Sequence, residues 1–158
     1  MRRDRSLSPV RAVLLGGLVV AVLDIGDAFV FFGLRGVRPI RILQGIASGL
    51  LGRGAFGGGL ATAALGASLH SFIATTIVLV YQVVSARLPA LRRQPWVYGP
   101  LFGVAAYLVM NLVVLPLSAV GAPKFVPPVV ANGLFAHIFL VGLPSALFAR
   151  ATRPGQGV

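Results

Sequence analysis

The chain has 158 residues, of which 57% are hydrophobic and only 11% are charged. Soluble domains carry about 25% charged residues, so this composition, with a mean hydropathy of +0.92, argues against a soluble globular protein. The 14 basic residues outnumber the acidic ones and give a net charge of +11. They flank long apolar runs, which indicates membrane topology and not nucleic-acid binding. The absence of cysteine excludes disulfides, thiolate metal sites and cysteine nucleophiles.

Four segments are long and apolar enough to cross a hydrocarbon core of roughly 30 Å, which requires about 20 helical residues. They cover about residues 13–34, 60–84, 97–119 and 129–149. The first segment is too long for a signal peptide and contains Asp24 and Asp27 with no small-residue cleavage site after it. The sequence therefore predicts an all-α integral membrane four-helix bundle, organised as a single membrane domain over residues 1–158.

Residues 39–51, between the first two spans, predict an additional helix. Pro39 suits a first helical position, where its missing N–H costs nothing. One face of this helix is apolar, with Ile42, Leu43, Ile46, Ala47 and Leu50, and another is largely polar, with Arg38, Arg41, Gln44, Ser48 and Gly52. The pattern favours a helix lying in the membrane interface; a re-entrant helix that enters the bundle is the alternative. The glycine-rich residues 52–59 indicate a flexible connection into the second span.

Small residues and prolines predict how the spans pack. Ala63, Ala67, Ser71 and Thr75 recur every four residues, as do Gly99 and Gly103, and this spacing lets transmembrane helices approach closely. Pro116 and Pro144 lie late in the third and fourth spans, where each should distort its helix and release a backbone carbonyl.

The basic residues predict the orientation of the chain. Nine of them, Arg2, Arg3, Arg5, Arg11, Arg87, Arg92, Arg93, Arg150 and Arg153, fall on the side of the two termini. Five others, Arg35, Arg38, Arg41, Arg53 and Lys124, fall on the opposite side. Because cytoplasmic loops carry the excess of Lys and Arg, both termini of this multi-pass protein are expected in the cytoplasm.

Polar side chains within the spans form the candidate site. They are Asp24, Asp27, His70, Tyr107, Asn111, Asn132 and His137. Counting inward at 1.5 Å per residue places Asp24, His70, Asn111 and His137 near the bilayer midplane or slightly outside it, with Asp27 and Asn132 nearer the outer surface. Ionisable residues at such depth normally face a bundle interior or a cavity.

Three interpretations of this polar layer stay open. It can join helices through hydrogen bonds in a non-catalytic accessory or scaffold subunit. It can carry a small solute or a proton, with Asp24 and a histidine as exchanging groups. It can also hold haem b between His70 and His137, because two imidazoles at matched depth suit axial ligation. We expect no enzyme, since no P-loop, GxSxG or HExxH motif occurs, and no other metal site. The expected partners are the lipid bilayer and either further copies of the chain or a larger membrane complex, but no nucleic acid.

Four strings carry a family resemblance: VLDI (residues 22–25), ILQGIASGLLG (42–52), YLVMN (107–111) and VGLP (141–144). Across most of residues 11–149 the chain resembles a group of uncharacterised bacterial inner-membrane proteins of the YagU-like kind. The resemblance implies location in the bacterial inner membrane and a multi-pass topology. It implies no particular activity.

Overall fold

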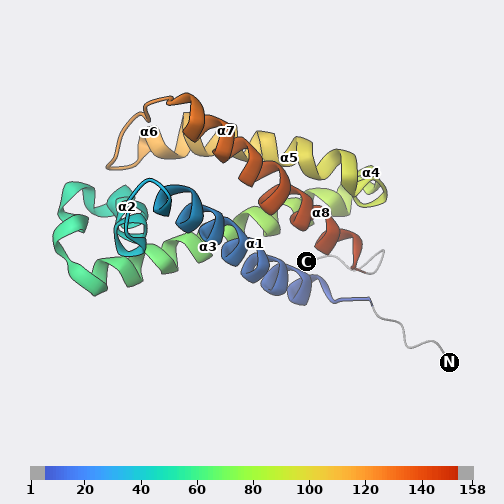
Figure 1. Ribbon diagram of the computed structural model, residues 1–158. Coiled ribbons are helices and arrows are strands. Elements are labelled where there is room, and N and C mark those ends of the chain that lie inside the picture. The colour runs from blue at the N-terminus through green and yellow to red at the C-terminus, as the bar shows by residue number, and fades with distance from the viewer. Residues whose placement is uncertain (1–5, 153–158) are drawn as a thin grey trace.

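The computed structural model describes residues 6–152, and the regular secondary structure in this range is helical. Four of its helices are long and apolar enough to cross a membrane: Pro9–Gly33, Gly59–Arg87, Pro95–Leu117 and Pro127–Arg150. They run side by side along one axis (Figure 1). The predicted all-α fold with four spans is therefore confirmed, and each predicted span overlaps its helix over nearly its whole length.

The first and second spans are each one continuous α-helix, whereas the third and fourth are interrupted. The continuous spans are α1 (Pro9–Gly33) and α3 (Gly59–Arg87). The third span consists of α5 (Pro95–Val109), the π-helical segment η2 (Met110–Val114) and α6 (Leu115–Leu117). The fourth consists of α7 (Pro127–Phe135), the π-helical segment η3 (Ala136–Gly142) and α8 (Leu143–Arg150). The connections contain α2 (Pro39–Leu51), the 3₁₀ turn η1 (Gly52–Gly57) and α4 (Pro89–Arg93).

Large apolar side chains cover the outside of the bundle. On α1, Leu14, Leu18 and Val22 follow one another along an exposed stripe, and on α3 the side chain of Phe72 is 68% exposed. Soluble monomers rarely expose continuous apolar patches of this extent. In a bilayer the same stripe faces hydrocarbon at no cost, which is the arrangement expected of a membrane protein.

Helix α2 has the predicted bounds, but a different face of it is buried. The helix is seen nearly end-on in Figure 1, so it crosses the bundle axis near the end of α1 and the start of α3. Gln44, Ala47 and Ser48 are buried, whereas Leu50 is 63% exposed. Polar side chains can lie inward here because they are hydrogen-bonded: Gln44 Nε2 donates to the carbonyl of Gly59 at 3.0 Å. Helix α2 thus lies across the spans and does not run parallel to them (Figure 1).

Close backbone contacts at glycine join the third and fourth spans. A Cβ on Gly103 would overlap the carbonyl of His137, and one on Gly99 would lie 2.9 Å from the Cα of Leu143. Gly99 and Gly103 therefore occupy packing positions, as their spacing predicted. The stripe predicted on the second span packs only in part: Ala63 is buried and Thr75 lies against Gly17 of α1, whereas Ser71 is exposed. Helix α3 approaches α2 instead through Gly66, where a Cβ would overlap the carbonyl of Leu43.

The π-helical segments end directly before the two prolines. Segment η2 is followed by Leu115 and Pro116, and η3 by Leu143 and Pro144. A proline ring clashes with the carbonyl four residues earlier and offers no N–H. A wider turn avoids that clash, so the predicted distortion takes the form of a π segment in both spans.

A polar cluster formed by α3, α4 and Thr152, which follows α8, lies at the end of the bundle opposite α2. Its members are Gln82, Ser85, Arg92 and Thr152. Gln82, only 1% exposed, donates from Nε2 to the hydroxyl of Thr152 at 3.3 Å. Arg92 Nε donates to Ser85 Oγ at 3.0 Å, and partial burial lowers the pKa of its guanidinium from the ordinary value. This terminal cluster fixes α3, α4 and the end of the fourth span to one another.

Both ends of the described chain lie together beside this terminal cluster. The N–H of Leu7 donates to the carbonyl of Ala151 at 2.9 Å. Among residues 6–152, this end of the bundle carries five basic residues, Arg11, Arg87, Arg92, Arg93 and Arg150, and the other end carries the same number. The predicted asymmetry thus depends on Arg2, Arg3, Arg5 and Arg153, which lie outside the described residues.

The glycine contact between the third and fourth spans should dominate their association. We expect Gly103→Ala to destabilise the protein by about 1–3 kcal/mol, because its methyl group has no space beside the backbone of His137. The matched control is Gly26→Ala, where nothing lies within 4 Å of the added methyl group; it should be neutral or up to about 1 kcal/mol more stable. Reversible unfolding in mixed micelles, followed by circular dichroism, measures both. Equal effects at the two glycines would contradict the close contact.

Candidate functional site

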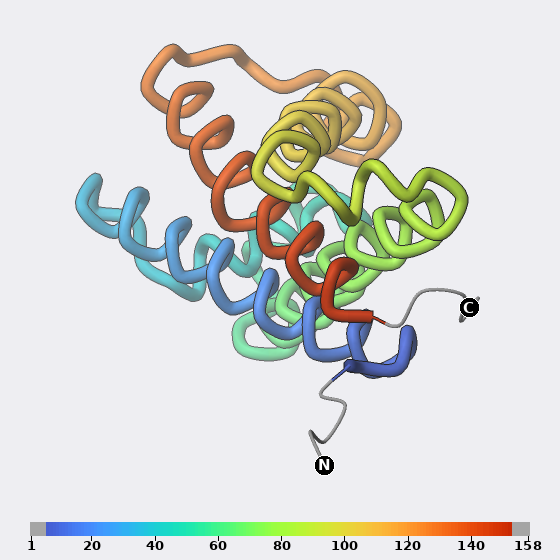
Figure 2. Tube along the Cα trace, turned by 90° about the vertical axis from the view of Figure 1, so that its right-hand side faces the viewer, coloured from blue at the N-terminus to red at the C-terminus, as the bar shows by residue number. Residues whose placement is uncertain are grey.

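A partly open cavity of about 670 Å³ lies in the half of the bundle that α2 covers. Its wall comes from α1, α2, α3, the end of the third span and segment η3 of the fourth. Figure 2 shows the fourth span between α1 and the third span, and these neighbours pack against one another. Helix α3 and segment η2 instead face each other across the cavity, which apolar side chains line for the most part. Its volume is within the range of small-molecule sites.

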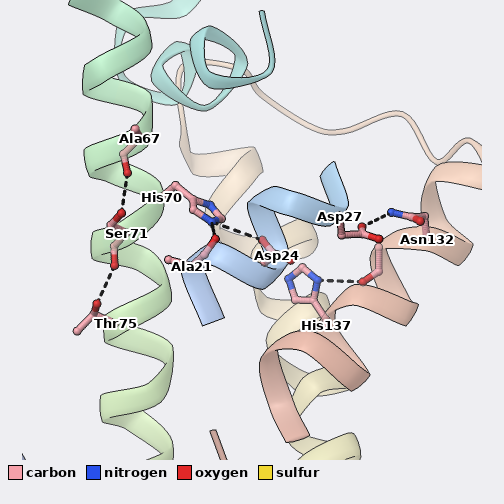
Figure 3. Close-up of polar contacts among 10 residues, drawn as sticks. Ala21, Asp24, Asp27, Ala67, His70, Ser71, Thr75, Asn132 and His137 are labelled. Atoms are coloured by element: carbon pink, nitrogen blue, oxygen red, sulfur yellow. Dashed lines mark hydrogen bonds and ion pairs between the residues drawn. The ribbon is translucent and has the colours of Figure 1, made fainter. Parts of the chain in front are cut away.

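Asp24 and His70 bring α1 and α3 together at the cavity wall (Figure 3). His70 Nε2 lies 3.0 Å from the carbonyl oxygen of Ala21, which can only accept, so this nitrogen carries the proton and donates. The same nitrogen is 3.9 Å from Asp24 Oδ2. Asp24 accepts no hydrogen bond from the described residues, and its side chain is 25% exposed. Its carboxylate is therefore available at the cavity.

His137 and Asn111 reach the same cavity from the two π-helical segments. His137 Nδ1 donates to the carbonyl of Gly133 at 2.9 Å, which leaves Nε2 without a proton in the neutral ring. Asn111 Nδ2 donates to the carbonyl of Tyr107 at 2.9 Å. Isolated π turns within helices occur frequently at functional sites. Here they place one polar side chain from each interrupted span at the cavity.

Asp27 has a partner, in contrast to Asp24. Asn132 Nδ2 donates to Asp27 Oδ2 at 2.7 Å and so connects α1 to α7 (Figure 3). This pair lines a second, smaller hollow of about 120 Å³ between α1 and the fourth span, whose wall also includes Asp24 and His137. The two carboxylates of α1 thus differ: one holds helices together, and the other stands between two hollows.

The structure brings most of the predicted polar layer to one place. Asp24, His70, Asn111 and His137 line the main cavity, and Asp27 and Asn132 line the hollow beside it. Tyr107 is the exception, because it is buried behind His137, with the two rings edge to face at 5.4 Å. Across residues 6–152 no three or more His, Cys, Asp and Glu side chains are grouped to hold a metal ion.

Helix α2 contributes a wall that the polar residues alone did not indicate. Gly45, Ile46 and Gly49 line the cavity, and a Cβ on Gly45 would meet nothing within 4 Å. The four-residue spacing of Gly45 and Gly49 is the signal in the sequence for this open face. In the same region, the N–H of Ala119 donates to the carbonyl of Gly49 at 2.9 Å, which attaches α2 to the end of the third span.

Comparison with protein-family models, curated proteins and solved structures yields no match to the chain.

Double-mutant cycles with Asn132 can measure which of the two aspartates is hydrogen-bonded to it. Asp27→Ala and Asn132→Ala should show a coupling energy of about 0.6 kcal/mol and at most ~1.7 kcal/mol, the range of hydrogen bonds between transmembrane helices. Asp24→Ala paired with Asn132→Ala should give a coupling near zero, because no hydrogen bond joins these side chains. Unfolding in mixed micelles gives each value. A coupling at Asp24 as large as that at Asp27 would show that the assigned partners are wrong.

Proposed function

We propose that the protein is a multi-pass protein of the bacterial inner membrane that handles a small solute, or a proton, at the cavity. One observation carries the proposal: a 670 Å³ cavity within the spans borders a carboxylate, Asp24, that has no hydrogen bond from the described residues. The proposal also includes the predicted orientation, with both termini in the cytoplasm, membership of the YagU-like group, and assembly as a homo-oligomer or within a larger complex.

The contrast between the two aspartates supports a functional role for Asp24. An acidic residue near the bilayer centre costs roughly 2.5–3.5 kcal/mol on insertion scales. A structural role recovers part of this cost through a hydrogen bond, as Asp27 does with Asn132 at 2.7 Å. Asp24 instead faces open space, with the imidazole of His70 at 3.9 Å. Its carboxylate is therefore free to bind a solute or to exchange a proton.

The two histidines add ring nitrogens that can donate or accept a hydrogen bond at the cavity. Each uses one ring nitrogen to donate to a backbone carbonyl, and each retains a second nitrogen. With Asp24 they provide three titratable groups on one cavity wall. A proton can move between such groups only through water or a solute in the cavity, because no direct hydrogen bond connects them. The proposed handling involves binding and exchange, with no covalent chemistry on the solute.

The accessory or scaffold role is the alternative, and it needs no hydrated cavity. Holding haem b between His70 and His137 is a further alternative, and it predicts a Soret band in the absorption spectrum of the purified protein. The proposed function predicts no such band but a cavity that water-soluble molecules reach.

Cysteine labelling tests the proposal, since the chain contains no cysteine of its own. Ile73 lines the cavity, and its neighbour Phe72 faces outward from the same turn of α3. We expect a cationic methanethiosulfonate reagent to modify Ile73→Cys at least ~10-fold faster than Phe72→Cys in proteoliposomes, because the reagent reacts with ionised thiols, which form in water and not in hydrocarbon.

The two cysteines lie on different faces of α3 but at nearly the same depth in the membrane. A difference in their labelling rates therefore reports whether each thiol faces the cavity or the lipid. Equally slow modification at both positions would mean that no water reaches the cavity. That result would contradict the handling of a solute or proton and would favour the scaffold role.

A further inference from the structure

We propose that the solute bound in the cavity is a small lipophilic amine, held as its ammonium cation at Asp24. This inference rests on the proposed function and adds the chemical class of the ligand. It follows from the charge, the hydrogen-bonding groups and the apolar surface of the cavity wall.

The charge of the wall selects a cation. Asp24 is the single formally charged side chain among the described residues that line the cavity. The chain has 14 basic residues and a net charge of +11, yet no Arg or Lys is among these lining residues. An anionic solute would meet the carboxylate of Asp24 with no compensating positive side chain in a medium of low dielectric constant. A cationic solute would supply the positive charge that the Asp24 carboxylate lacks beside it.

The hydrogen-bonding groups of the wall select a donor. His70 donates through Nε2 to Ala21, and His137 donates through Nδ1 to Gly133. When the rings are neutral, the remaining ring nitrogen of each histidine, Nδ1 of His70 and Nε2 of His137, can only accept a hydrogen bond. The carboxylate of Asp24 also only accepts. Asn111 donates one of its two amide hydrogens to Tyr107 and offers a carbonyl oxygen that accepts. An ammonium group, with up to three N–H donors and no acceptor, complements this set.

The rest of the wall requires an apolar body on the same molecule. Leu69 and Ile73 of α3, Ile46 of α2 and Val114 of η2 surround the space beside the polar groups. A bare ammonium ion would lose its hydration without apolar contacts in return, whereas an alkyl or aryl group gains about 25 cal/mol for each Å² of apolar surface that it buries. A cavity of about 670 Å³ accommodates an amine with a ring or a short chain.

Isothermal titration of the full-length protein in lipid nanodiscs tests the ligand class with three probes that share a phenyl group. They are 2-phenylethylamine, which is a cation at pH 7, the neutral 2-phenylethanol, and the anion 3-phenylpropanoate; empty nanodiscs correct for partition into lipid. We expect the amine to bind at least ~10-fold more tightly than the alcohol, and the carboxylate to show no binding.

Three variants locate the binding. Asp24→Asn should bring the affinity for the amine down to that for the alcohol, while its unchanged affinity for the alcohol shows that the cavity is intact. Gly45→Leu should remove binding of both, because its side chain extends into the open space of the cavity. Gly26→Leu is the matched control: it is also a helical glycine with nothing within 4 Å, but it does not line the cavity. This control should bind like the parent chain.

The possible failures are distinguishable. If none of the three probes binds, the amine inference fails, whereas the proposed function stands or falls with the labelling of Ile73→Cys against Phe72→Cys. If the alcohol or the carboxylate binds as tightly as the amine, and Gly45→Leu removes that binding, the cavity holds a solute but the amine inference is wrong. Amine binding that survives Gly45→Leu would place the cation outside the cavity and would also overturn the inference.

Discussion

Asp24 imposes the constraint on which the rest of the structure depends, because a carboxylate in the middle of an apolar helix must be kept away from lipid. Helix α3 meets this constraint by placing His70 at 3.9 Å from the carboxylate. The fourth span contributes His137 to the same wall. Neither histidine donates a hydrogen bond to Asp24, so the carboxylate stays available to a molecule in the cavity.

The cavity exists because close packing is distributed unevenly along the bundle. Gly16 and Gly17 bring α1 against Val78 and Thr75 of α3, and the glycines of the third and fourth spans bring those helices together. At the end that α2 covers, α2 packs against α3 and forms part of the cavity wall. The π-helical segments before Pro116 and Pro144 lie at this level and present Asn111 and His137 to the space that remains.

Much of the fold could be predicted from hydropathy and proline positions, because these act locally. The four spans follow from apolar length, and α2 begins at Pro39 as the preference of proline for a first helical position predicts. The inward face of α2 could not be predicted, since Gln44 is buried only because Gly59 offers a carbonyl. Nor did the sequence indicate the terminal cluster, whose hydrogen bond between Gln82 and Thr152 joins residues far apart in the chain.

In the candidate site, too, some features could be predicted from the sequence and others depend on how the helices pack. Counting along the helices placed Asp24, His70, Asn111 and His137 at a similar depth, and the structure brings all four to one cavity. Depth alone does not tell which aspartate is paired, because the pairing of Asp27 with Asn132 depends on the rotation of α1 against α7. That distinction between a hydrogen-bonded and an available carboxylate is what makes Asp24 the centre of the proposed binding site.

A crystal structure grown in a lipid mesophase with 2-phenylethylamine present would test the central claim most directly. The claim predicts the amine inside the cavity, with its nitrogen within hydrogen-bond distance of the Asp24 carboxylate and its ring against Ile73 and Val114. A lipid chain filling the cavity, with Asp24 hydrogen-bonded to a protein side chain and no amine beside it, would contradict the claim.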